Sequence, residues 1–200
     1  MNTPDLPVHI VGELILLLKV QPDRFSYASA GEGTAPHFAA ELFKLHTGVT
    51  LPGVTYTGAA PAIADTVRGN TQVMFPSRFT AQPYLRSGKL QALAVAGPAR
   101  LPSLPDMPTL TEAGLAGIEL TQWYALFAPA KTPLAVVTQL NHALNTVLQD
   151  PEIIARIGAD GAQVQTSTPG ELHSLLLAEK QKWQQVVRQI GLQVETQTLE

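Results

Sequence analysis

Small and hydroxyl-bearing residues follow a short apolar segment near the start of the chain, in the stretch YASAGEGTAPHF at positions 27–38. Gly31 and Gly33 allow the backbone to bring several N–H groups close to a small ligand. Thr34 comes directly before a predicted helix, whose first turn has further unpaired N–H groups and the positive end of the helix dipole. This arrangement favours the binding of an anion such as a carboxylate.

Two later turns have the same character. Tyr56–Ala60 and Phe75–Arg78 each lie between a predicted strand and a predicted helix, and each combines small or hydroxyl residues with a glycine or a proline. Ligands of open α/β sheets bind at the carboxyl ends of the strands, where such turns lie. The spacing is equally compatible with ordinary strand-to-helix connections, so it does not by itself establish a ligand site.

Several side chains near these turns have both a functional and a structural interpretation. His37 could donate to a ligand, but a histidine in the first turn of a helix is more often a structural partner of nearby groups. Glu32 would repel an anion, so we expect it to face solvent. Trp123 and Tyr124 could cover a ligand, although aromatic residues in an extended segment more often belong to the core.

Catalytic and cofactor motifs have little support. The stretch YASAG lacks the first glycine of the G-x-S-x-G motif, and Ser29 and His37 have no identifiable acidic third member. The sequence has no phosphate-binding loop and no dinucleotide fingerprint, and its five histidines lack metal-ligand spacing. We therefore expect no enzyme activity, no metal and no cofactor; a hydrolase using Ser29 is the least favoured function.

The composition excludes several other classes. With 45% hydrophobic residues among 200, the chain can bury a sizeable core. A charged fraction of 14% and a net charge of −3 provide no basic patch, which argues against nucleic acid as a partner. The apolar run Glu13–Val20 is too short to span a membrane, and the start MNTPD lacks the basic flank of a signal peptide, so we expect no signal peptide here.

Hydrophobic periodicity predicts alternating strands and helices, and hence an α/β fold with parallel pairing in its first part. Four prolines make 97–108 an extended connector, and 118–130 is expected to be extended as well. Thr132 is predicted to cap a helix whose first residue is Pro133. The predicted strands are 25–28, a segment ending at 56, 71–75, 90–96 and 162–165; the predicted helices are 10–21, 35–47, 60–68, 78–87, 133–149, 151–157 and 169–190.

The order of several motifs resembles the Bug-type (TctC) substrate-binding proteins of tripartite tricarboxylate transporters. The motifs are YASAGEGTAPHFAAELFK, TYTGAAPAIADTVRG, SGKLQALAVAG, RLPSLPDMPTLTEAGLAG and WYALFAPAKTP. The resemblance implies the two-lobed fold of type II periplasmic binding proteins. It also implies a periplasmic location, a small carboxylated solute as ligand, and a membrane permease as the partner that receives the solute.

The resemblance assigns ligand contacts to three turns of the second lobe. This chain departs from the usual family pattern at Thr57 in place of lysine, and at Pro76 and Gln72 in place of aspartate, so the solute preference of relatives is not transferred. The residues assigned to the ligand site are Ser29, Ala30, Gly31, Gly33, Thr34 and His37 in the first turn, Tyr56, Gly58 and Ala59 in the second, and Ser77 in the third.

The resemblance also predicts a truncated arrangement, because family members have a further N-terminal stretch that contains the ligand loop of the first lobe. Residues 7–118 are expected to form a complete second lobe, and 119–200 the crossover strand and C-terminal helices of the first lobe. Uncovered apolar side chains on the helix beginning near Leu134 would each forfeit roughly 1.5–3 kcal/mol. We expect these helices to fold back onto the second lobe or to form a homodimer.

Two functions remain open at this point. The first is a truncated solute-binding protein that holds a small carboxylate through backbone amides and delivers it to a tripartite tricarboxylate transporter. The alternative is a remnant that binds no solute and acts as an interaction or self-assembling module.

Overall fold

The computed structural model describes residues 1–101, 104–159 and 162–191. The end of the predicted C-terminal part, 192–200, lies outside the described residues, as do 102–103 of the proline-rich connector. The chain divides into two compact units, Met1–Trp123 and Tyr124–Glu200, and each is described by itself.

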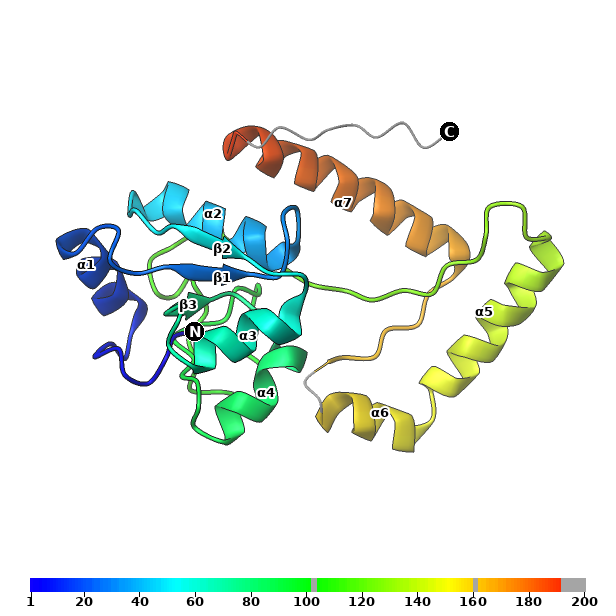
Figure 1. The fold of residues 1–200 in the computed structure, drawn as a ribbon. Helices are drawn as coiled ribbons and strands as arrows, with labels where there is room; N and C mark the ends of the chain where they lie inside the picture. The colour runs from blue at the N-terminus through cyan, green and yellow to red at the C-terminus, as the bar shows by residue number, and fades with distance from the viewer. Residues whose placement is uncertain (102–103, 160–161, 192–200) are drawn as a thin grey trace. The chain divides into compact units, whose positions relative to one another are not determined.

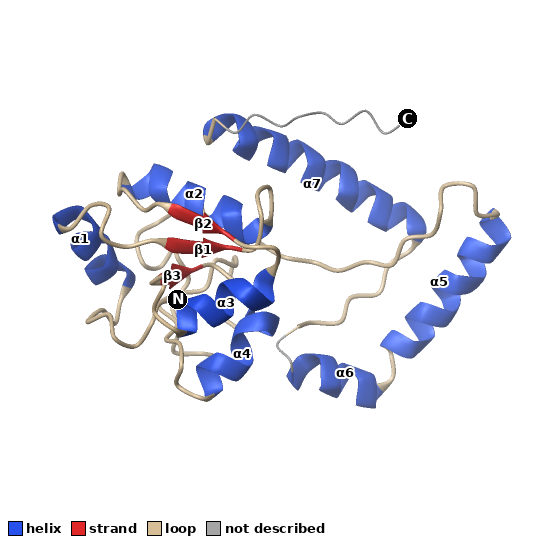
Figure 2. Ribbon diagram, viewed as in Figure 1, coloured by secondary structure: helices blue, strands red, loops and turns tan. Residues whose placement is uncertain are grey.

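A three-stranded parallel sheet forms the centre of the first unit. Its strands are β1 (Tyr27–Ser29), β2 (Gly53–Thr55) and β3 (Val73–Met74), in the order β2-β1-β3 (Figures 1 and 2). The central strand β1 is buried along its whole length, as is usual for a parallel strand with neighbours on both sides. The predicted parallel α/β arrangement is confirmed.

The chain near Asn2 extends this sheet beyond β3. Asn2 forms antiparallel bridges with both Val73 and Gln91, and the Asn2 and Gln91 backbones exchange two hydrogen bonds of 3.0 Å. The predicted strand 90–96 is wrong, because this segment forms only isolated bridges at Gln91 and Val95. Gln91 pairs with Asn2 and Val95 pairs with Thr109, so the two ends of the segment have different partners and form no continuous ladder.

The described residues of the first unit also form four helices: α1 (Val11–Val20), α2 (Ala35–Thr47), α3 (Ala59–Val67) and α4 (Arg78–Arg86). Gly48 ends α2 in a left-handed conformation, with φ of 65°. The side chain of Ser77 caps α4 by accepting a hydrogen bond from the Thr80 N–H. A buried cluster lies between α3 and the sheet and consists of Ala28, Ala62, Ile63, Met74 and Leu90.

The second unit contains α5 (Leu134–Leu148), α6 (Pro151–Ala159) and α7 (Pro169–Gln189). The predicted start of α7 is confirmed, because Thr168 and Glu171 form a reciprocal capping box. The predicted start of α5 is wrong by one residue, since Pro133 occupies the N-cap position. The predicted strand 162–165 is also wrong: within the described residues this segment is extended but has no neighbouring strand.

Apolar side chains of the second unit remain largely exposed. No residue of α5 is buried, and Leu134 is 78% exposed. Tyr124 is 72% exposed, which contradicts its expected place in the core. Among the helices of the described ranges, none combines the length and the apolar character needed to cross a membrane.

Candidate functional site

The three predicted turns follow the carboxyl ends of β1, β2 and β3. Since these strands are parallel, their carboxyl ends lie at one edge of the sheet (Figure 1). The first two turns are joined directly, because the Tyr56 N–H donates to the Ser29 carbonyl over 2.9 Å. The fold therefore brings together residues that lie far apart in the sequence.

The first turn is closed by hydrogen bonds to one carbonyl. The Gly31 carbonyl accepts from Ser29 Oγ at 3.0 Å and from Thr34 Oγ1 at 2.7 Å. Thr34 occupies the predicted N-cap position of α2, but its side chain makes this bond and does not cap the helix. Gly31 has φ of 136°, a conformation that side-chain-bearing residues rarely adopt, so a glycine is required there.

His37 lies beneath the first turn and holds it from the side of α2. Its Nδ1 atom accepts a hydrogen bond from the Gly33 N–H at 3.2 Å, and the residue is only 9% exposed. Its Nε2 atom lies 3.9 Å from Glu41 Oε1. Glu41 is an acidic neighbour of His37 that the motifs did not predict, although a spacing of four residues on one helix face is a signal for such a pair.

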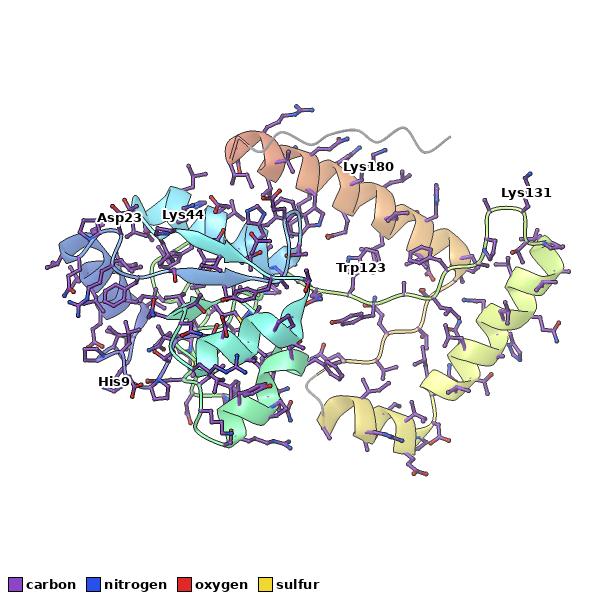
Figure 3. All side chains as sticks on the ribbon, viewed as in Figure 1. His9, Asp23, Lys44, Trp123, Lys131 and Lys180 are labelled. Atoms are coloured by element: carbon purple, nitrogen blue, oxygen red, sulfur yellow. The ribbon has the colours of Figure 1, made fainter. Side chains whose placement is uncertain are left out.

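Glu41 is the centre of a small polar network below this turn. It accepts hydrogen bonds from the Tyr27 hydroxyl at 2.7 Å and from the Lys44 ammonium at 2.8 Å; Figure 3 labels Lys44. Burial raises the pKa of Glu41, but the hydrogen bonds from Lys44 and Tyr27 outweigh it and leave the pKa below its ordinary value of 4.5. Burial, with the bond to Glu41, raises the pKa of Tyr27 well above its usual range.

The geometry does not pair Ser29 with His37 as a nucleophile and its base. The hydroxyl of Ser29 donates to the Gly31 carbonyl, and the Nδ1 atom of His37 accepts from Gly33. Ser29 is 1% exposed, so its hydroxyl is closed off from solvent. Glu41 does lie near His37, but the Ser29 hydroxyl donates its proton to the Gly31 carbonyl and not to His37.

The second turn presents backbone at Gly58. This residue has φ of 127°, and a Cβ atom placed there would meet nothing within 4 Å. The hydroxyl of Tyr56 instead points back to α3 and donates to Asp65 Oδ2 at 2.8 Å. That bond, followed by the one from Arg68, lowers the pKa of Asp65, while burial and the same bond raise the pKa of Tyr56.

The third turn is anchored to its own helix. Ser77 Oγ accepts from the Thr80 N–H at 3.2 Å and lies 2.8 Å from Thr80 Oγ1. Ala30, Thr34, Ala59 and Ser77 are all partly exposed. Each of these predicted residues therefore has a surface that a ligand can reach.

The electrostatic setting of the three turns suits an anion. None of the helices α2, α3 and α4 has an acidic residue in its first turn, so nothing there cancels the positive end of the helix dipole. Glu32 is exposed, as expected. A Cβ atom at Gly33 would also meet nothing within 4 Å, which leaves open space above the first turn as well as the second.

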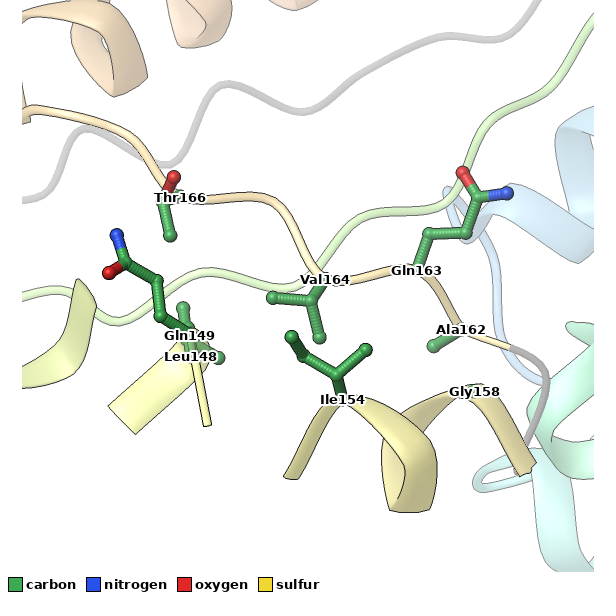
Figure 4. A pocket seen from close by; sticks show the side chains of 8 residues that line it. All are labelled: Leu148, Gln149, Ile154, Gly158, Ala162, Gln163, Val164 and Thr166. Carbon is green, nitrogen blue, oxygen red and sulfur yellow. The ribbon is translucent and has the colours of Figure 1, made fainter. Parts of the chain in front are cut away.

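Two hollows lie elsewhere, and neither is lined by a predicted site residue. One has a volume of about 360 Å³ in the first unit and includes Leu6, Leu17 and Gln72 in its lining. The other, of about 450 Å³, lies in the second unit next to α6 and includes Ile154 and Val164 (Figure 4). Within the described residues, no group of three or more histidine, aspartate or glutamate side chains is placed to hold a metal ion.

Several known proteins are similar to this chain in sequence and in fold. BugT of Bordetella pertussis is 29% identical over 191 residues, a match that covers 96% of this chain and 59% of BugT. The structure of R. palustris Rpa4515 with adipate has a TM-score of 0.92 and 31% identity, and the match covers 95% of this chain and 64% of that one. MatC from Rhodopseudomonas palustris with bound malate has a TM-score of 0.86 and 32% identity, with 93% and 64% coverage.

The chain thus spans between half and two thirds of the length of these relatives. The family match itself is nearly complete for this chain, because residues 1–192 match the family described as the tripartite tricarboxylate transporter family receptor, TctC. The matched structures have the fold of periplasmic binding proteins, one of them being BugD. The chain belongs to the TctC family of solute-binding receptors.

Proposed function

We propose that this protein binds a small carboxylate-containing solute at the carboxyl edge of the β2-β1-β3 sheet. The observation that carries the proposal is the convergence of three strand-to-helix turns with no acid in the first turn of any following helix. Helix N-termini and open glycine backbone are suited to a carboxylate. Two similar structures, Rpa4515 with adipate and MatC with bound malate, support this ligand class.

The backbone donors of the first two turns hold the solute in this proposal. Gly31, Gly33 and Gly58 allow close approach, while Ser29, Ala30, Thr34, His37, Tyr56 and Ala59 shape or border the turns, and Ser77 borders the third. The Gly33 N–H already donates to His37 Nδ1, and the Ser29 hydroxyl donates to the Gly31 carbonyl. His37 and Ser29 therefore act mainly by fixing the turn. The role is binding, with no chemical conversion of the solute.

The family membership supports a wider role. As a receptor of this type, the protein would hold its solute in the periplasm and pass it to the permease of a tripartite tricarboxylate transporter.

Thermal unfolding with a panel of mono-, di- and tricarboxylates, aromatic acids and amino acids tests the binding role. A solute at about a hundred times its Kd should stabilise the protein by roughly 2.7 kcal/mol. Thr34→Trp should abolish this stabilisation by filling the first turn, whereas Gln139→Trp on the exposed surface of α5 should retain it. Absence of a selective shift with every compound, or a shift that survives Thr34→Trp, contradicts the proposal.

A second candidate function rests on the exposed apolar side chains of the second unit. Leu134, Leu140 and Val147 on α5 are 78%, 48% and 52% exposed. Burial of such side chains is the main favourable contribution to association. We propose on this basis that the C-terminal helices form a homodimer interface, and that an assembling module is the alternative to solute binding.

Sedimentation velocity over a range of protein concentrations tests this second proposal. A dimer should form as the concentration rises, and Leu140→Glu should shift the equilibrium to the monomer. Gln139→Glu, at an exposed position on another face of the same helix, is the control and should leave the dimer intact. A protein that stays monomeric at all concentrations excludes the homodimer.

A further inference from the structure

The hydrogen bond between Gly33 and His37 connects a titratable side chain to the first turn. The Gly33 N–H can only donate, so the Nδ1 atom that receives it at 3.2 Å must have a free lone pair. The neutral ring therefore has its proton on Nε2, the atom that lies 3.9 Å from Glu41 Oε1. We infer that neutral His37 is the positioning residue of the Gly31–Gly33 turn, and that protonation of its Nδ1 atom releases the turn.

Protonation of the ring changes both of its contacts. A proton on Nδ1 removes the lone pair and places an N–H group against the Gly33 N–H, and two donors repel each other. The same proton makes the ring a cation, which is attracted to the Glu41 carboxylate on the other side. The two states of His37 therefore favour different partners: Gly33 when neutral and Glu41 when charged.

The surroundings of His37 define these two states. Glu41 lies on the same helix and is itself held by Lys44 and by the hydroxyl of Tyr27, which comes from β1. Glu32, on the turn, is near enough for its charge to act on Tyr27. The ring of Phe38 lies 6.1 Å from the imidazole, centroid to centroid. Only 9% of His37 is exposed, so water has little room to replace the lost bond to Gly33.

Gly33 is well placed to respond to this change. It is exposed, has φ of 70°, and would meet no atom within 4 Å if it had a Cβ. Ser29 Oγ and Thr34 Oγ1 both donate to the Gly31 carbonyl, and the Gly31 N–H donates to Ser29 Oγ at 3.3 Å, so these bonds of the turn do not involve Gly33. The bond to His37 is thus the contact that ties the Gly33 N–H to α2.

Another histidine on the same helix provides a matched control. His46 Nδ1 lies 2.9 Å from the Leu42 carbonyl, which can only accept, so His46 already has its proton on Nδ1. Protonation of His46 would leave that bond intact. The two histidines of α2 therefore have opposite hydrogen-bonding roles, and only His37 should be sensitive to acid in this way.

The consequence for the solute rests on the proposed function. A turn that is already fixed costs less conformational entropy on binding than a released one. Acidification through the titration of His37 should therefore weaken binding of a solute whose own charge does not change over that range. The expected loss is roughly three- to tenfold in Kd, the range for one hydrogen bond.

Nuclear magnetic resonance of the unliganded chain tests the positioning role directly. The ring nitrogens of His37 and the backbone amide of Gly33 are followed from pH 8 to pH 5. We expect the neutral ring to have the shift pattern of the Nε2–H form, and the Gly33 amide shift to follow the titration of His37. His37→Asn, whose Oδ1 can accept from Gly33, should keep a protected Gly33 amide and lose the pH dependence.

Two further variants make the outcome decisive. His37→Phe should increase hydrogen exchange at Gly33 at every pH, whereas His46→Asn should leave Gly33 unchanged. A Gly33 amide that ignores the titration of His37, or an Nδ1–H form of the neutral ring, overturns the inference. If the Gly33 amide shift follows the titration of His37 but no carboxylate binds at any pH, the positioning role of His37 stands and the proposed solute function fails.

Discussion

Among single residues, Gly53 shows how closely β2 approaches β1. A Cβ atom at Gly53 would lie 2.8 Å from the Cζ and hydroxyl atoms of Tyr27, closer than real Cβ contacts allow. Tyr27 is 2% exposed and is bonded to Glu41, so it has little freedom to move away. Gly53→Ala should therefore lower the free energy of unfolding by roughly 1–3 kcal/mol, measured by urea denaturation.

Gly12 in α1 provides the control for that substitution. It is exposed, has no positive φ, and has only a contact of 4.0 Å at the position of a Cβ atom. Gly12→Ala should leave the free energy of unfolding unchanged or raise it by up to about 1 kcal/mol, because alanine favours helix. Equal effects of the two substitutions would contradict the close packing of Tyr27 on Gly53.

Glu41 should give the protein a measurable dependence on acid. Its pKa lies below the ordinary value of 4.5, so its carboxylate stabilises the folded state above pH 4.5 and loses this effect as the pH falls through the folded pKa. Glu41→Gln should reduce the loss of unfolding free energy between pH 6 and pH 3 by roughly 0.2–1 kcal/mol. The exposed Glu119→Gln should retain the wild-type dependence, and an identical pH profile for Glu41→Gln would disprove this role.

Residue chemistry in the first turn could be predicted only in part. The need for glycine and the outward position of Glu32 follow from local backbone and charge, and the structure confirms both. The network around Glu41 could not be found from the turn alone, because Tyr27 reaches it across from β1. The assignment of the ten site residues to a ligand remains a prediction.

At the scale of secondary-structure elements, α7 depends on its first turn. The Thr168 side chain accepts from the Glu171 N–H, and the Glu171 carboxylate accepts from the Thr168 N–H at 2.7 Å. Thr168→Ala should destabilise this end of the helix by roughly 0.5–2 kcal/mol. Hydrogen exchange of the amides of residues 170–173 should increase, while Thr166→Ala, just outside the cap, should have no such effect. Unchanged exchange in Thr168→Ala would rule out the capping role.

Helices could be predicted more reliably than strands, for a physical reason. A helix makes its hydrogen bonds within one segment, so periodicity and caps such as Ser77 and Thr168 are sufficient to locate it. A strand exists only when another segment pairs with it. The segments 90–96 and 162–165 have apolar residues typical of strands, yet neither has the continuous partner that a ladder needs.

At the scale of the whole molecule, the two units differ in how much they bury. The first unit has a core that includes Phe43, Leu51 and Ile63, each at most 1% exposed, whereas no residue of α5 or α6 is buried. Amides of α5 and α6 should therefore exchange with solvent faster than those of α2 and α3 in the same sample. Equal protection, at a concentration where the protein is monomeric, would contradict this difference in local stability.

The order of pairing in the sheet has a consequence for how the first unit folds. Asn2 lies between Val73 and Gln91, and the Met1 amine donates to the Met74 carbonyl across 73 positions of the sequence. Contacts between such distant segments require a large loop to close first, which slows folding. During synthesis the Asn2 segment cannot complete its pairing until residue 91 has left the ribosome, so this segment must stay unpaired while all three strands β1, β2 and β3 are made.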